Sequence, residues 1–380
     1  MSTIGPLDPA VLPEGVRARI LRGVNGLDMH LLEAGFETPG RPCVLLLHGF
    51  PELAYSWRKL MGPLAAAGYY VVAPDQRGYG RTTGWDADYD GDVHAFHLLN
   101  IVRDALALIA ALGYREVAAV IGHDFGAPVA AWCALIRPDV FRAVAMMSAP
   151  FAGPPPLRPL PAEAPAEPPR DIHAELAALP RPRKHYQWYY SSRAANADMH
   201  HPPQGMHAFL RAYFHYKSAD WKQNQPFPLK RWSAEELAKM PTYYIMDLDK
   251  GMAETVAPEM PSAAEITVCR WLSDAALRVY SGEFERTGFQ GGLQWYRCAT
   301  DSRFMAEFKL FAGRTIDVPA CFIAGRSDWG IYQKPRDLEL MQQRACTQLR
   351  VCQLLEGAGH WVQQEQPEKV AALLLEFLRA

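Results

Sequence analysis

The chain has 380 residues, 49% of them hydrophobic, and a net charge of −2 at pH 7, so it is long enough for one large α/β domain or two smaller ones. The near-neutral charge, and apolar runs shorter than a membrane span, give no reason to expect nucleic acid or a membrane as partner. Seven scattered cysteines without a Cys-x-x-Cys pair, and a first segment (1–31) without a signal-peptide pattern, predict a cytoplasmic protein with reduced thiols.

The first 150 residues alternate between strand and helix patterns. Residues 16–22 and 29–33 are expected to pair as antiparallel strands around the turn Asn25-Gly26. Continuous apolar runs predict further strands, and periodic runs predict the helices between them. The strands are expected at 42–47, 69–73, 117–121 and 140–147, and the helices at 56–68 and 93–112. This alternation indicates a parallel sheet with covering helices, of which residues 1–150 form the first part.

The pattern changes after residue 150. Residues 152–170 are rich in proline and alanine and are interpreted as an exposed connector. The next segment, to residue 311, is helical in pattern and very aromatic. Strands resume only at 318–324 and 349–354, before an amphipathic helix at 367–378. Because the sheet is incomplete without these last strands, we interpret 151–311 as a helical cap inserted into a core that 312–380 completes. The alternative is a second, independent domain.

A strand, a tight turn and a helix follow one another at 117–137. The turn reads Gly122-His123-Asp124-Phe125-Gly126, the position of a nucleophile elbow, Gly-x-Ser-x-Gly, with aspartate in place of serine. An aspartate is already ionised at neutral pH and needs no base to activate it. Asp124 is therefore predicted to attack an electrophilic carbon and form an ester with the protein. The alternative is an ordinary turn with Asp124 as a helix cap.

An elbow nucleophile needs a base and an acid that orients the base, in the chain order nucleophile, acid, histidine. His360 is the only histidine in the resumed sheet region and follows its last strand, and Asp328 follows the strand before it. His360 is predicted to take a proton from the water that attacks the Asp124 ester. Asp328 is predicted to hold the imidazole tautomer. A capping or core histidine is the alternative for His360.

Backbone N–H groups are needed where the charge of the tetrahedral intermediate develops. The N–H of Phe125, directly after Asp124, is one expected oxyanion donor, and the N–H of Phe50, after the strand at 42–47, is the other. The bond before Pro51 is a candidate cis peptide, because cis bonds are almost confined to proline.

Several segments resemble soluble epoxide hydrolases of the α/β-hydrolase superfamily. They are His48-Gly49-Phe50-Pro51-Glu52 with Tyr55-Ser56-Trp57-Arg58, residues 75–80, residues 122–126, and Gly359-His360-Trp361. In the cap, Gln294-Trp295-Tyr296-Arg297 is similar to the family's Asn-Trp-Tyr-Arg. The resemblance covers 1–150 and 280–380 well and is poor over 151–180 and 217–279. It implies the α/β-hydrolase fold, with a mostly parallel eight-stranded sheet and an inserted cap.

The resemblance also implies a pair of cap tyrosines at the epoxide oxygen. One is Tyr296, and for its partner we choose Tyr186 over Tyr189 and Tyr190. A phenol can hydrogen-bond and then protonate the alkoxide that epoxide opening creates. Plain packing in so aromatic a segment is the alternative for both. The other side chains expected to bind substrate are His48, Pro51, Trp188, Tyr189, Trp295 and Trp329.

The predicted function is the hydrolysis of an apolar or aromatic epoxide to a vicinal diol, with a small hydrophobic substrate and water as partners and no cofactor. No metal is expected at His200, His201 and His207, because no acidic or cysteine ligand pattern accompanies them. A haloalkane dehalogenase is an alternative, although Phe125 has no ring N–H for a halide. An ester or lactone hydrolase, and a ligand-binding relative without turnover, are further alternatives, and a homodimer is left open.

Overall fold

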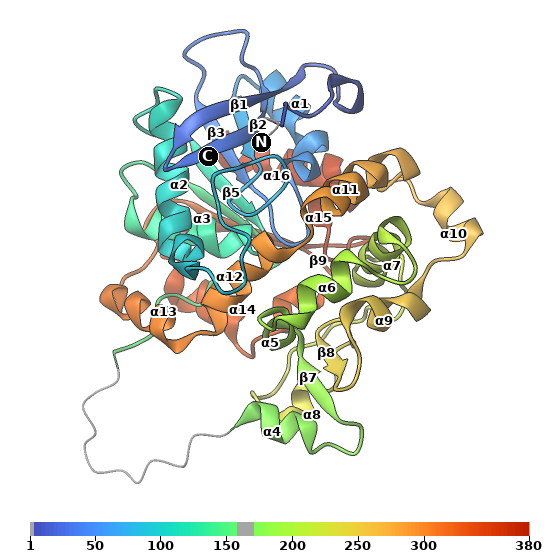
Figure 1. The fold of residues 1–380 in the computed structure, drawn as a ribbon. Coiled ribbons are helices and arrows are strands. Elements are labelled where there is room, and N and C mark those ends of the chain that lie inside the picture. Colours follow the sequence, from blue (N-terminus) through green and yellow to red (C-terminus); the bar gives the residue numbers. More distant parts are fainter. Residues whose placement is uncertain (1–3, 158–170, 380) are drawn as a thin grey trace.

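The computed structural model describes residues 4–157 and 171–379 (Figure 1). Its core is an eight-stranded sheet in the order β1-β2-β4-β3-β5-β6-β9-β10. The strands are β1 (Val16–Val24), β2 (Leu27–Ala34), β3 (Cys43–Leu47), β4 (Tyr70–Pro74), β5 (Ala119–His123), β6 (Val144–Met147), β9 (Ala320–Gly325) and β10 (Leu349–Leu355). β2 pairs antiparallel with β1 and with β4, and the other pairs are parallel. The predicted fold class is confirmed.

The central strands read as continuous apolar runs because helices cover both faces of the sheet. β3, β4, β5, β6 and β9 are buried over their whole length. The core helices are α1 (Arg58–Ala66), α2 (Leu98–Ala111), α3 (Gly126–Ile136), α14 (Asp337–Leu340), α15 (Val362–Glu365) and α16 (Pro367–Arg379). The predicted hairpin between β1 and β2 turns at Asn25 and Gly26, which have φ of 48° and 82°, as a type I′ turn requires.

The segment between β6 and β9 is mostly helical, and its residues 171–256, drawn in green to yellow, lie at the lower centre and right of Figure 1. Its helices are α4 (Ile172–Ala177), α5 (Tyr186–Tyr190), α6 (Ala194–His200), α7 (Met206–Lys217), α8 (Ala234–Leu237), α9 (Met252–Val256), α10 (Ala263–Val268), α11 (Asp274–Thr287), α12 (Gln290–Thr300) and α13 (Ser302–Glu307). It also holds a small antiparallel pair, β7 (Arg183–His185) and β8 (Ile245–Asp247). The purely helical pattern expected here missed this pair, because three-residue strands are too short to show a period of two.

The helix expected at 93–112 is interrupted. A 3₁₀ turn (Val93–Phe96) precedes α2, and His97 between them is extended. The ring of His97 stacks on Phe304 with centroids 5.0 Å apart, so a contact with the cap holds the residue out of the helix. Most of the proline-rich connector, residues 158–170, lies outside the described residues. Within the described ranges, no helix is long and apolar enough to cross a membrane.

Two contacts fix the cap on the carboxyl edge of the sheet. The indole N–H of Trp295 in α12 donates to the carbonyl of Arg77, just beyond β4, at 2.9 Å. The N–H of His360, just beyond β10, donates to the carbonyl of Lys217 at the end of α7 at 2.9 Å. The cap therefore closes over the edge where open α/β sheets bind ligands.

Candidate active site

The turn after β5 has the geometry of a strained elbow. Asp124 has a φ of 51°, a left-handed conformation that is rare for residues other than glycine. A Cβ on Gly122 would lie 2.0 Å from the carbonyl oxygen of Gly126. Glycine at position 122 therefore lets β5 and α3 approach closely enough to present Asp124 at the carboxyl edge.

Each oxygen of the Asp124 carboxylate has its own partner. The N–H of Phe50 donates to Oδ1 at 2.9 Å, and Nε2 of His360 lies 3.3 Å from Oδ2. Burial alone would raise the pKa of Asp124, but the hydrogen bond and charge of His360, with a contribution from Lys217, outweigh burial and hold that pKa below its usual range. Asp124 is therefore an anion with one oxygen held and the other facing the imidazole.

The other ring nitrogen of His360 has two partners. Nδ1 lies 3.1 Å from Oδ1 of Asp328 and 2.9 Å from Oγ of Ser148, which follows β6. Asp328 is held in turn by the N–H of Gly330 at 2.6 Å. The structure thus brings together the three residues that the sequence pointed to. Ser148 was missed, although its place at the carboxyl end of the strand beside β5 was a signal that could have found it.

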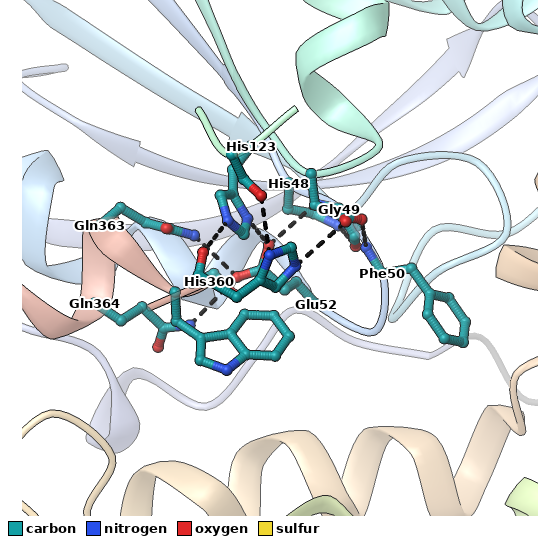
Figure 2. Close-up of polar contacts among 12 residues, drawn as sticks. His48, Gly49, Phe50, Glu52, His123, His360, Gln363 and Gln364 are labelled. Atoms are coloured by element: carbon teal, nitrogen blue, oxygen red, sulfur yellow. Dashed lines mark hydrogen bonds and ion pairs between the residues drawn. The ribbon is translucent and has the colours of Figure 1, made fainter. Parts of the chain in front are cut away.

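A buried polar network joins His123 and Glu52 to the backbone of His360 (Figure 2). His123 donates from Nδ1 to Glu52 at 2.5 Å and from Nε2 to the carbonyl of His360 at 2.7 Å. Glu52 also accepts from the N–H of Gly49 at 3.2 Å and from Gln363 at 3.0 Å. Although burial opposes the charge, Glu52 raises the pKa of His123, and His123 lowers the pKa of Glu52. This ion pair links the loop of Phe50 to the loop of His360, and sequence reasoning did not find it.

Two cap tyrosines approach the elbow. The ring of Tyr296 stands edge-on to Phe50 and to Phe125, with centroids 5.4 and 5.0 Å away, and 5.9 Å from the ring of Tyr186. The Tyr186 hydroxyl donates to Gln333 at 3.0 Å. Burial and the negative charge of Asp124 raise the pKa of both phenols well above 10. Both phenols are therefore protonated at neutral pH, and the proton of Tyr186 is directed to Gln333 in this structure.

The rivals of Tyr186 have their hydroxyl groups engaged elsewhere. Tyr189 donates to Asp198 and accepts from the N–H of Met252 at 3.2 Å, both inside the cap. The hydroxyl of Tyr190 pairs with that of Tyr213 at 3.1 Å. The structure therefore does not bring the hydroxyl of Tyr189 to Asp124, and the choice of Tyr186 over Tyr190 stays a prediction.

The other expected substrate residues divide into two groups. His48 accepts from the N–H of Gln76 at 3.1 Å beneath the loop of Phe50, whose bond to Pro51 is cis. Trp295 packs edge-on against Phe125, with centroids 5.3 Å apart. Of these expected residues, Trp295 therefore contacts the elbow directly, and the His48 ring packs away from it on Gln76 and Tyr79.

Two of the expected tryptophans pack on other side chains. Trp188 contacts the rings of His173 and His185, and Trp329 contacts the ring of Phe227. The structure does not bring Trp188 to Asp124, because a residue two positions after Tyr186 on α5 faces the opposite side of the helix.

Lys217 is a buried cation close to the active site. The side chain of Lys217 lies among the rings of Tyr213, Tyr243, Tyr244 and Trp361, with Nζ 4.9 to 5.8 Å from their centroids. Burial lowers its pKa, and the carboxylates of Asp124, Asp328 and Glu52 oppose that change. Among the described residues no cluster of three His, Cys, Asp or Glu side chains could hold a metal. His200 and His207 instead contact the carbonyl of Glu285 and the carboxylate of Asp274.

An aspartate elbow, a histidine after the last strand and an acid after the strand before it define a hydrolase of the α/β class. The family model described as "alpha/beta hydrolase fold" matches residues 42–367. Epoxide hydrolase A of Mycobacterium tuberculosis is 34% identical over 373 residues, which cover 96% of this chain and 98% of the relative. The chain therefore belongs to the alpha/beta hydrolase fold family and, within it, to the epoxide hydrolases.

Solved structures agree with that assignment. An epoxide hydrolase from an endophytic Streptomyces superposes with a TM-score of 0.74 at 30% identity, covering 97% of this chain and 96% of the other. Potato epoxide hydrolase I gives a TM-score of 0.69 at 29% identity, with coverage of 96% and 99%. The similarity extends through the cap, where the sequence resemblance was weakest.

Proposed function

We propose that this protein adds water to an apolar or aromatic epoxide and gives a vicinal diol, through an ester formed on Asp124. The observation that carries the proposal is the carboxylate of Asp124 between the N–H of Phe50 and Nε2 of His360. This arrangement supplies a nucleophile, an oxyanion donor and a base around one carbon atom. The similarity to epoxide hydrolases supports the substrate class.

In the first half-reaction, Oδ2 of Asp124 attacks one epoxide carbon and the carbon–oxygen bond breaks. The alkoxide oxygen then takes a proton from Tyr296 or Tyr186, whose rings lie within 5.9 Å of each other. Protonated phenols suit this task because an alkoxide leaves poorly without a hydrogen bond and a proton. Oδ1 becomes the carbonyl oxygen of the ester and stays on the N–H of Phe50.

In the second half-reaction, His360 takes a proton from water, and the water oxygen attacks the carbonyl carbon of the Asp124 ester. The negative charge moves onto Oδ1, where the N–H of Phe50 already points and the N–H of Phe125 joins it. Asp328 stabilises the imidazolium through Nδ1. Collapse of the intermediate breaks the ester bond, and the leaving alkoxide takes the proton from His360 to complete the diol. Asp124 is left as a carboxylic acid, whose proton returns the tyrosinate of the first half-reaction to tyrosine.

Isotope labelling under single turnover tests the covalent step. Excess enzyme reacts once with styrene oxide in ¹⁸O-water, and the peptide that contains Asp124 is then analysed by mass spectrometry. We expect ¹⁸O in the Asp124 carboxylate and none in the diol. Label in the diol alone would show direct attack by water and refute the proposal. Asp124→Ala is the matched control and should produce no diol.

Turnover of other substrate classes separates the alternatives. A dehalogenase would release halide from a haloalkane and form no diol from an epoxide, and neither Phe125 nor Trp295 offers a free ring N–H to a halide. The ring of Phe125 has no N–H, and the indole N–H of Trp295 is bound to the carbonyl of Arg77. An ester or lactone hydrolase would turn over carbonyl substrates faster than epoxides.

We also propose a cytoplasmic location. All seven cysteines are free thiols, and five of them are buried, as expected in a reducing compartment. The homodimer stays a prediction, which light scattering of the purified protein tests.

A further inference from the structure

Ser148 occupies a place in the site that the proposed mechanism does not use. Its side chain is fully buried, and its Oγ lies 2.9 Å from Nδ1 of His360. Oδ1 of Asp328 is farther from the same nitrogen, at 3.1 Å. Since Nδ1 carries one hydrogen, the serine hydroxyl and the carboxylate share it. The nearest acceptor for the imidazole is therefore a hydroxyl.

We propose that Ser148 is a positioning residue for His360, which accepts the Nδ1 proton in a hydrogen bond and directs its own O–H to Asp328. A hydroxyl has one donor and two acceptor sites, so it can serve both partners at once. This inference rests on the proposed function, because it concerns the step in which His360 activates water.

The surroundings of Asp328 support this assignment. Oδ2 of Asp328 is buried and has no hydrogen-bond partner by distance and angle among the described residues, an arrangement that is costly for a carboxylate. The Ser148 hydroxyl lies against the same carboxylate. A Cβ added at Gly330 would lie 2.5 Å from Oγ of Ser148 and 2.8 to 3.0 Å from both carboxylate oxygens. The nearby Ser148 side chain also contributes to the lowered pKa of Asp328. An O–H turned toward Asp328 therefore meets an acceptor.

The backbone at Ser148 adopts a strained, left-handed conformation. Its φ is 70°, one of four positive values at residues other than glycine in the described chain, and Asp124 is another. A left-handed conformation costs about 1 kcal/mol for a residue with a Cβ, and glycine avoids that cost. This conformation places Oγ beside Nδ1 of His360. Strained backbone of this kind is common at functional sites.

The two half-reactions depend differently on this hydrogen bond. Attack by Asp124 on the epoxide needs no base, so the rate of ester formation should not depend on Ser148. Hydrolysis of the ester needs a correctly oriented His360 that can hold a proton. Without the hydroxyl, Asp328 alone orients the ring, and we expect hydrolysis to slow about tenfold, the upper end of the range for one ordinary hydrogen bond.

Two variants separate the hydroxyl from the backbone. Ser148→Ala removes Oγ and keeps the strained backbone, while Ser148→Gly removes Oγ and relieves the strain. Ester formation and hydrolysis are followed with styrene oxide under single turnover by rapid quench and intact-protein mass spectrometry. We expect both variants to form the ester at the wild-type rate and to hydrolyse it about tenfold more slowly. Ser148→Gly should unfold at the higher temperature.

The controls make each failure distinguishable. Ser233→Ala removes another fully buried serine hydroxyl, a helix cap at α8, and should lower stability without changing either rate. If hydrolysis in both Ser148 variants stays within twofold of wild type, or if glycine restores the rate that alanine loses, the inference is wrong. If wild-type enzyme forms no ester, the proposed function fails instead.

Discussion

Gly49 lies directly against the side chain of Asp124. A Cβ at position 49 would be 2.3 Å from Cβ of Asp124 and 2.5 Å from its Oδ1. The next residue, Phe50, donates its N–H to that same oxygen. The absence of a side chain at Gly49 thus allows the oxyanion donor to reach the carboxylate.

Gly49→Ala should therefore nearly abolish activity. The added methyl group must displace either the Asp124 carboxylate or the loop that carries the N–H of Phe50. A displacement of about 1 Å costs on the order of 100-fold in rate, so we expect kcat to fall at least that far in steady-state assays with styrene oxide.

A second glycine provides the control. Gly62 lies inside α1, where nothing approaches within 4 Å of an added Cβ. Gly62→Ala should leave kcat unchanged and change the free energy of unfolding by less than about 1 kcal/mol, because Pro63 disfavours a helical residue with a Cβ before it and offsets the higher helix propensity of alanine. Normal activity of Gly49→Ala would show that the loop moves freely and that the Phe50 contact is not needed.

Single Tyr→Phe substitutions should rank the four cap tyrosines. Tyr296→Phe and Tyr186→Phe each remove a donor for the alkoxide, so we expect ester formation to slow about 100-fold, the lower range for loss of a general acid. Tyr189→Phe and Tyr190→Phe should leave that rate within a few-fold, because their hydroxyl groups bind Asp198 and Tyr213. Stopped-flow tryptophan fluorescence under single turnover measures the rate.

The outcome for Tyr190→Phe is the sharpest part of this test. The centroid of its ring lies 5.0 Å from that of Tyr296. A general disturbance of the cap would therefore slow Tyr190→Phe as much as Tyr186→Phe. Equal losses in Tyr190→Phe and Tyr186→Phe would contradict the assignment of Tyr186 as a proton donor. Circular dichroism and thermal unfolding of each variant check that the fold is retained.

The sequence was most informative where chain order determines position. Strands and helices alternate on either side of the cap, and the carboxyl ends of parallel strands meet at one edge. Asp124, Asp328 and His360 each follow a strand, so their meeting could be predicted from order alone. The position of the Phe50 N–H at this edge was predictable for the same reason, because Phe50 follows β3.

Contacts that depend on side-chain direction could not be predicted in this way. Neighbours on a short helix point in different directions, so Tyr186 reaches the site while Trp188 packs on His185. Likewise, the pair of His123 and Glu52 joins residues 71 positions apart, and no local pattern in the sequence indicates such a pair.

The pair of Glu52 and His123 should control how stability depends on pH. The pKa of His123 is raised in the folded protein, so its contribution is complete below about pH 6.5 and is lost as pH rises through the folded value. The pKa of Glu52 is lowered, so its contribution is present above about pH 4.3 and lost as pH falls. The wild-type pair is therefore most stabilising between these limits.

Glu52→Gln should reverse this dependence. Without the carboxylate, burial disfavours protonated His123 and moves its pKa below the unfolded value. The variant should then gain stability as pH rises from 5 to 7. In the wild type, His123 gives no such gain over this range. At pH 7 we expect the variant to be less stable by about 3 kcal/mol, the lower range for breaking a buried ion pair.

Urea unfolding at five pH values from 5 to 9 measures this effect. Glu116→Gln is the matched control, because Glu116 is an exposed acid that lies 3.8 Å from Arg142. Removing such a surface charge should change the free energy of unfolding by less than about 1 kcal/mol at every pH. If Glu52→Gln kept the wild-type slope above pH 6.5, His123 would not be the group that titrates. The carbonyl of His360 would then be held by a neutral imidazole.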